Sequence, residues 1–164
     1  MRRPVGPRKN IVDFESSLNT ELVGEVMSAP VCVEAGATVR EVFALLKQRN
    51  TGSVLICEDR RLLGIFTERD VLRLMARRAS IDVPIETVMV STPATTSVES
   101  TVGEAIRVMF SGGYRRLPVV DVDGAVIGVV KVSRVVRFLV EHFPEAIYNL
   151  PPVPDPIMQE REGS

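Results

Sequence analysis

The segment GIFTERD, residues 64–70, brings a hydroxyl and a carboxylate together at the end of an apolar run. Thr67 and Asp70 stand three residues apart, which is the spacing of a cap that closes the first turn of a helix. A carboxylate is also a pure acceptor that can take two hydrogen-bond donors at once. The amino-terminal end of a helix attracts anions such as phosphate. Thr67 and Asp70 therefore form a structural cap, a ligand site, or both.

The chain that carries this segment repeats itself once. Residues 26–67 and 88–131 show the same features in the same order, and the offset between them drifts only from 62 to 64. The matched pairs include Pro30 with Pro93, Thr38 with Thr101, Glu41 with Glu104, and Gly64 with Gly128. The sequence is therefore a duplication of about sixty residues.

Each copy predicts the order strand, helix, strand, strand, helix. Thr38 with Glu41, and Thr101 with Glu104, predict two helix starts with a capping box, and apolar residues follow each at helical spacing. The other predicted elements are extended stretches at 31–33 and 94–97, strand pairs at 53–57 with 62–67 and at 117–120 with 125–130, and final helices at 69–78 and 133–142. A one-sided sheet cannot bury its apolar face alone, so the predicted fold is α/β (α+β), with two β-α-β-β-α repeats packed sheet to sheet in pseudo-symmetry.

The predicted organisation places these two repeats between two arms. The N-terminal arm spans residues 1–20, the first repeat 21–80, the second repeat 81–143, and a Pro-rich C-terminal arm 144–164. The motif PPVPDP predicts an extended segment that either hangs free or packs across a neighbouring subunit. Because no effector domain fits in the arms, we expect any regulated protein to be a separate chain.

Composition argues against several functions. A formal net charge of −1 and the lack of Trp argue against a nucleic-acid-binding face. The basic start of the chain, with Lys131 and Arg134, leaves a nucleic-acid accessory role as an alternative. Cys32 and Cys57 form no CxxC motif and His142 is the only histidine, so we expect no metal site. No pair of nucleophile and base is visible, so we expect no enzyme.

The sequence also predicts where the protein resides. No apolar run approaches the roughly 20 residues of a membrane span, and the basic N-terminus is followed by acids rather than by the apolar region of a signal peptide. We therefore expect a cytoplasmic protein with no membrane partner. In that reducing compartment a disulfide between the two cysteines would be the exception.

The ordered set of motifs resembles a tandem pair of cystathionine-β-synthase (CBS) domains, the regulatory Bateman module. The resemblance covers about residues 21–142, and is carried by the VM-x-x-P segments, the Thr-Val-x-Glu helix starts, LPVVD and GIFTERD itself. It implies a module that senses AMP, ADP, ATP or S-adenosylmethionine in the cleft between the repeats and modulates a partner protein. It also implies a flat, disc-like homodimer. The alternative is a structural dimerisation module whose cleft is vestigial.

The same resemblance assigns roles to particular residues. It implies that Asp70 accepts hydrogen bonds from both ribose hydroxyls and that Thr67 steers the chain around the phosphates. Arg115 and Arg116 match residues with which the opposite repeat meets the phosphates. Strand alternation lets at most one of them face the cleft, and otherwise both are solvated or pair with nearby acids. The further residues expected near the ligand are Ile65 against the adenine, Thr95, Thr96 and Ser97 along the base, and Arg69, Tyr114 and Lys131.

The second copy departs from the motif of the first. Lys131 stands where the threonine would be and Arg134 where the aspartate would be, so the ribose acceptor is lost. The first copy has residues 51–53 (TGS) where the second has Tyr114 and the two arginines. We therefore expect one nucleotide site per chain, with Lys131 able to reach its phosphates.

Apolar residues on the last predicted helix point to a contact beyond the repeat. They lie on more than one side of residues 132–143, namely at Val135, Val136, Phe138, Leu139 and Val140. A second buried face of this kind predicts a homodimer, or else a contact with the segment 11–27.

Overall fold

The computed structural model describes residues 15–144, so the predictions for residues 1–14 and 145–164 lie outside the described residues. The first repeat forms a sheet with the strand order β1-β2-β3-β4, in which β1 runs parallel to β2 and the other pairs are antiparallel. Its elements are β1 (Cys32–Val33), α2 (Val39–Gln48), β2 (Ser53–Glu58), β3 (Arg61–Thr67), α3 (Glu68–Ala76) and β4 (Val90–Ser91).

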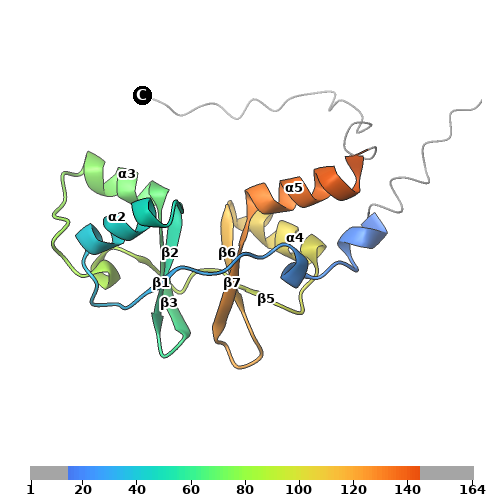
Figure 1. The fold of residues 1–164 in the computed structure, drawn as a ribbon, viewed down its shortest axis with the longest axis horizontal. Coiled ribbons are helices and arrows are strands. Elements are labelled where there is room, and N and C mark those ends of the chain that lie inside the picture. The colour runs from blue at the N-terminus through green and yellow to red at the C-terminus, as the bar shows by residue number, and fades with distance from the viewer. Residues whose placement is uncertain (1–14, 145–164) are drawn as a thin grey trace, which may run out of the picture.

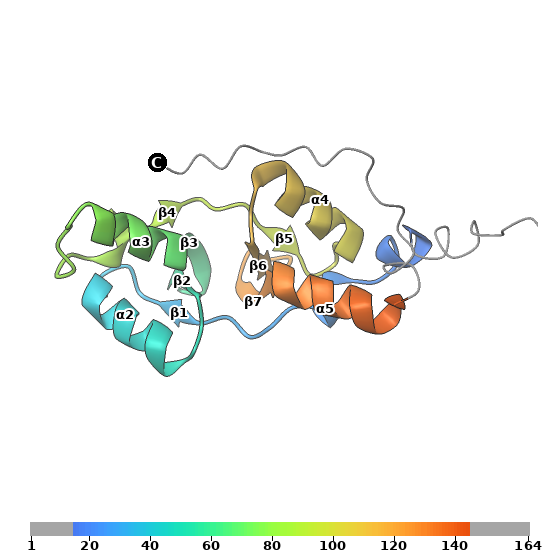
Figure 2. The ribbon, with the colours of Figure 1, turned by 90° about the horizontal axis from the view of Figure 1, so that it is seen from above.

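The second repeat builds a smaller sheet in the same way. Its strand order is β5-β6-β7, again with one parallel and one antiparallel pair. Its elements are β5 (Thr96–Ser97), α4 (Val102–Gly112), β6 (Arg116–Val120), β7 (Val126–Lys131) and α5 (Val132–His142). Figures 1 and 2 show the two sheets side by side in the middle of the molecule, with α2 and α3 outside the first and α4 and α5 outside the second. The predicted fold class is confirmed.

A seam of apolar side chains joins the two sheets. Leu55, Cys57 and Ile65 of the first sheet cluster with Val126 of the second, and all four are buried. The two hairpins also touch through backbone, because the N–H of Val126 donates to the carbonyl of Arg60 at 2.9 Å. The sheet-to-sheet packing therefore extends to the turn end of both hairpins.

The segment that precedes each repeat, here called its leading segment, packs into the core of the other repeat. The sequence did not predict this exchange. The first leading segment (residues 21–28) contains the short helix η1 (Val23–Glu25), and Val23 is buried in the core of the second repeat. The second leading segment (residues 83–91) contains η2 (Ile85–Thr87), and Ile85 is buried in the core of the first. The carbonyls of residues 21 and 83 also accept hydrogen bonds from the first helical N–H of α4 and α2, at 2.8 and 3.0 Å. The two cores are therefore interdependent.

The matched glycines of the repeats lie where these leading segments pass. A Cβ on Gly64 would overlap Sδ of Met89 and lie 2.8 Å from the backbone oxygen of Val90. A Cβ on Gly128 would lie 2.7 Å from Sδ of Met27 and 3.2 Å from the oxygen of Ser28. Glycine at both positions allows the other repeat's leading segment to lie directly against the strand.

Local signals in the sequence set the starts and ends of several helices. Both capping boxes form, and Glu41 and Glu104 accept the backbone N–H of Thr38 and Thr101 at 2.7 and 2.8 Å. Gly113 ends α4 in the left-handed conformation at φ 66°. No helix among residues 15–144 is long and apolar enough to cross a membrane.

Candidate functional site

Asp70 is a buried carboxylate at the start of α3. Its side chain is 5% exposed. One carboxylate oxygen, Oδ2, accepts hydrogen bonds from the backbone N–H of Thr67 at 2.9 Å and from the Thr67 hydroxyl at 3.1 Å. The structure thus forms the helix cap that the sequence predicted for this pair.

The other carboxylate oxygen of Asp70 faces Arg73. Nη1 of Arg73 lies 3.1 Å from Oδ1, and the Arg73 side chain is half exposed. A carboxylate offers about four acceptor positions, of which three are used here. Since Arg73 can turn outward to water at little cost, Oδ1 can accept two further hydroxyl donors. The cap and a ligand contact are therefore compatible.

Arg116 reaches this helix start from the opposite repeat. It is the first residue of β6, and its Nη2 lies 3.7 Å from Oε2 of Glu68, the first residue of α3. A Cβ on Gly52 would overlap this Nη2 atom, so glycine at position 52 leaves the space that the guanidinium occupies. The N–H of Glu68 donates to the carbonyl of Gly52 at 3.1 Å. The guanidinium therefore lies over the amino-terminal end of α3.

A second cation accompanies Arg116. Lys131 is its direct partner in the antiparallel pairing of β6 with β7, and like charges in directly opposite positions repel. The equivalent pair in the first repeat is neutral, with Ser53 opposite Thr67. The Nε atom of Arg116 is also buried without a hydrogen-bond partner in the described part of the chain. An anion near the start of α3 would relieve this repulsion.

The start of α5 differs from that of α3 in the way that the sequence predicted. Lys131 occupies the cap position without a side-chain cap bond, and the first turn of α5 contains no acid. Arg134, at the place of Asp70, is exposed. The second repeat thus has no buried carboxylate matching Asp70.

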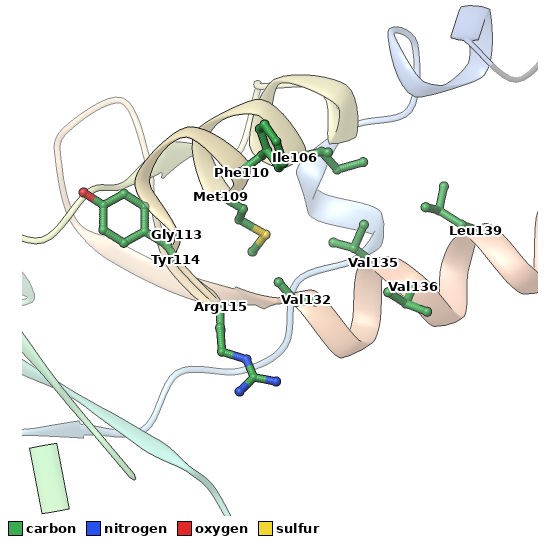
Figure 3. A pocket seen from close by; sticks show the side chains of 10 residues that line it. All are labelled: Ile106, Met109, Phe110, Gly113, Tyr114, Arg115, Val132, Val135, Val136 and Leu139. Atoms are coloured by element: carbon green, nitrogen blue, oxygen red, sulfur yellow. The ribbon is translucent and has the colours of Figure 1, made fainter. Parts of the chain in front are cut away.

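Arg115 and Tyr114 lie beside the helices of the second repeat. They border a groove of about 440 Å³ between α4 and α5, which is lined by Ile106, Met109, Phe110, Gly113, Val132, Val135, Val136 and Leu139. Figure 3 shows the guanidinium of Arg115 directed away from these apolar side chains. Of the two neighbouring arginines, Arg116 is the one that forms an ion pair with α3 among the described residues.

The other predicted ligand residues are spread over the molecule. Ile65 is 7% exposed within the seam, and Arg69 is exposed on α3. Thr96 is buried on β5, and the hydroxyl oxygen of Ser97 accepts the N–H of Glu99. Thr95 borders a hollow of about 610 Å³ with hairpin residues such as Asp59. That hollow lies at the turn end of β3, about 20 Å from Thr67 along a strand of this length.

Several residues near Asp70 were missed by the sequence analysis. Residues 90 and 91 pair with β3, with Val90 opposite Ile65. Arg73 could have been found from its i,i+3 spacing to Asp70. Gly52 could have been found as a glycine at a strand start, which often marks close approach of another group.

The site contains no recognisable metal centre. Over the described range 15–144, no three His, Cys, Asp or Glu side chains form a group that could hold a metal ion. The arrangement consists of a buried acceptor, a helix start and two cations. These groups can bind a molecule that carries both hydroxyls and a negative charge.

Comparison with known proteins identifies the fold. Residues 23–77 and 85–141 match the family model described as CBS domain. An uncharacterised 17.7 kDa protein of Acidianus ambivalens is 29% identical over 110 residues, covering 66% of each chain. The chain spans less than two thirds of the length of this relative and of two further curated relatives.

Two solved structures show the same architecture. A CBS domain protein of Pyrobaculum aerophilum complexed with AMP has a TM-score of 0.66 and 27% identity, covering 69% of this chain and 88% of that one. The CBS domain pair of protein MJ0100, in complex with 5′-methylthioadenosine and S-adenosyl-L-methionine, has a TM-score of 0.67 and 23% identity, covering 72% and 98%.

Proposed function

The chain belongs to the CBS domain family, and on that premise we propose that it is a regulatory module that binds an adenosine nucleotide between its two repeats. In this proposal the ribose hydroxyls donate to Asp70 and the phosphate lies at the start of α3, beside Arg116. Binding changes how the repeats are held together, and a separate partner protein responds. The module has no catalytic role in this proposal and works in the cytoplasm.

The position of Arg116 is the observation that carries the proposal. Its guanidinium comes from the second repeat but lies over Gly52 and Glu68 of the first. A phosphate held there touches both repeats at once, because the helix N–H groups come from one and the cation from the other. A ligand of this kind favours one arrangement of the two repeats, which is how binding energy becomes a signal.

The local charge favours a phosphate-bearing ligand over S-adenosylmethionine. Arg116 and Lys131 face each other across β6 and β7, and Glu68 is the acid that Arg116 approaches. A phosphate is attracted to these cations, whereas the positive sulfonium of S-adenosylmethionine is repelled. The AMP complex of the Pyrobaculum aerophilum protein supports the same ligand class.

Thermal unfolding with a panel of ligands tests the proposal. The panel contains AMP, ADP, ATP, S-adenosylmethionine and adenosine, and the proteins are the wild type, Arg116→Gln and Arg115→Gln. Ligand at a hundred times its Kd should stabilise the wild type by about 2.7 kcal/mol. Arg115→Gln is the matched control, because it removes the same charge one residue away, beside the α4–α5 groove.

The expected pattern separates phosphate from ribose recognition. Arg116→Gln should weaken AMP by about 10- to 100-fold, since a charge-assisted bond contributes about 1.5–3 kcal/mol. The same variant should leave adenosine binding unchanged, because adenosine has no phosphate. Equal weakening in Arg115→Gln would contradict the phosphate-binding role of Arg116. No stabilisation by any ligand would contradict nucleotide binding and favour the structural dimerisation module.

We also propose that two copies of the chain associate through their helices. Phe110 on α4 is 89% exposed and Val136 on α5 is 52% exposed, and both border the apolar groove. On the first repeat, Leu72 and Met75 of α3 are exposed as well. Apolar side chains gathered on helix faces of both repeats favour a homodimer.

Mass measurement in solution tests this association. Phe110→Glu should convert a dimer into a monomer, because a charge would be buried at the contact. Val122→Glu is the control, since Val122 is 79% exposed but lies in the β6–β7 turn. A monomeric wild type, or a dimer that tolerates Phe110→Glu, would rule out this interface.

A further inference from the structure

The two cysteines of the chain lie in contact with each other. Cys32 is on β1 and Cys57 is on the neighbouring strand β2, and their sulfur atoms are 3.4 Å apart. In the parallel pairing Cys32 lies opposite Leu55, so Cys57 is the next residue of β2 on the same face. The Cys57 thiol donates a hydrogen bond to the sulfur of Cys32.

The two sulfurs have different surroundings. Cys32 is exposed, whereas Cys57 is buried in the seam beside Ile65 and Val126. The hydrogen bond from Cys57 lowers the pKa of Cys32 to about 7, while the same bond and burial raise the pKa of Cys57. Near neutral pH a substantial fraction of Cys32 is therefore an exposed thiolate beside a buried, protonated thiol. The thiolate is the nucleophilic form of cysteine.

We propose that Cys32 and Cys57 form a redox pair that peroxide closes into a disulfide within one chain. The Cys32 thiolate attacks a peroxide oxygen, so that an S–O bond forms, the O–O bond breaks and water leaves after protonation. The sulfur of Cys57 then attacks the sulfenic acid of Cys32, the S–S bond forms and the S–O bond breaks. The thiol proton leaves with the released oxygen as a second water. Two electrons pass from the sulfurs to one peroxide.

The position of Cys32 in the fold makes bond formation feasible. An S–S bond is about 2.05 Å long, so the two sulfurs must approach by only about 1.4 Å, and the movement can come from Cys32. β1 has two residues and is an edge strand with β2 as its one neighbour, which allows this shift. Cys57, in the middle of the seam, can remain in place.

The disulfide would fix a connection between the repeats. β1 continues from the first leading segment, where the backbone of Ser28 exchanges two hydrogen bonds with Val129 of β7. A disulfide between β1 and β2 would therefore fix the first leading segment to the sheet of the first repeat, while its hydrogen bonds to β7 hold it to the sheet of the second repeat. Oxidation should raise the midpoint of thermal unfolding, because the bond also closes a loop that contains α2.

Oxidation of the reduced, full-length protein with hydrogen peroxide tests the inference. Both thiols should be lost together, the intact mass should fall by two hydrogens, and peptide mapping should join Cys32 to Cys57. A thiol reductant should restore both thiols. Non-reducing electrophoresis should show no covalent dimer.

Two variants identify the attacking and the resolving sulfur. Cys57→Ala should stop oxidation at a sulfenic acid on Cys32, which dimedone traps, and should slow alkylation of Cys32 at neutral pH by about fivefold to tenfold. Cys32→Ser should leave Cys57 reduced, because Cys57 is buried. Since Cys57→Ala can lower stability, the peptide map of the wild type stands as an independent test. Disulfides only between chains, or over-oxidation of Cys32 at the same rate with and without Cys57, would overturn the inference.

Discussion

Arg116 of the second repeat and Glu68 of the first form a long ion pair, with 3.7 Å between Nη2 and Oε2. The Glu68 side chain is 70% exposed and the Arg116 side chain 21%, so the acid can swing into water while the guanidinium stays in place. A phosphate can therefore replace Glu68 at Arg116 without disturbing the core. Whether it does so depends on the space around the guanidinium.

Gly52 controls that space. Gly52→Ala should displace Arg116, because the new Cβ would overlap Nη2 and lie 2.7 Å from Cδ of Glu68. Titration calorimetry should show AMP binding weakened about tenfold, with adenosine binding little changed. Gly36→Ala is the control, since a Cβ at Gly36 meets nothing within 4 Å. If AMP binds Gly52→Ala as well as the wild type, Arg116 does not hold the phosphate.

Asp70 and Glu104 occupy the same place in two capping boxes but should differ in function. Asp70→Ala should lower the free energy of unfolding by about 1–2 kcal/mol and Glu104→Ala by about 1 kcal/mol, because each loses cap hydrogen bonds. Urea unfolding with and without AMP measures both effects. The stabilisation by AMP should vanish in Asp70→Ala alone. If AMP still stabilises Asp70→Ala, Asp70 acts only as a helix cap.

The matched glycines Gly64 and Gly128 should tolerate a methyl group unequally. Gly64→Ala pushes against a backbone oxygen at 2.8 Å and should cost about 1–3 kcal/mol. Gly128→Ala should cost less, because the flexible Met27 side chain can move and the backbone oxygen of Ser28 is 3.2 Å away. Urea unfolding of the two variants compares them. The opposite order would mean that the two leading segments are held differently from this structure.

Glu41 should make the stability of the protein depend on pH. The backbone N–H of Thr38 lowers the pKa of Glu41 below its ordinary 4.5, and the Thr38 hydroxyl adds to this. A carboxyl with a lowered folded pKa stabilises fully above its unfolded pKa and loses that contribution as the pH falls through the folded value. The stability difference between wild type and Glu41→Gln should therefore be constant near neutral pH and shrink below pH 4.5. Urea unfolding across this range measures it, and a difference that grows on acidification would contradict the assignment.

Local features of the fold could be predicted from the sequence because each depends on a few neighbouring residues. The caps at Thr38 and Thr101 need only an acid three residues later, and the helix end at Gly113 needs only a left-handed residue. The exchange of leading segments could not be predicted in this way. Val23 and Ile85 read as ordinary apolar residues, and only the tertiary fold decides which core buries them.

The candidate site also combines local features that the sequence predicts with tertiary contacts that it does not predict. Thr67 and Asp70 meet as their spacing predicts. Arg116 was named from the family resemblance, but the space left by Gly52 required the structure. The pairing of Val90 and Ser91 with β3 could not be predicted, because it joins segments that are far apart in the sequence. The contact of Cys32 with Cys57 depends on the register of β1 with β2, which no local pattern encodes.

The exchange of leading segments determines whether a single repeat could form a complete core on its own. One repeat alone would expose the core position that the other repeat's Val23 or Ile85 fills. Two separate copies could fill both positions only by trading segments, which makes a domain-swapped dimer the smallest complete unit. Duplication within one chain then amounts to a covalent fusion of that swapped pair. Fragments cut between residues 80 and 81 should accordingly be unstable apart and recover the native fold when mixed.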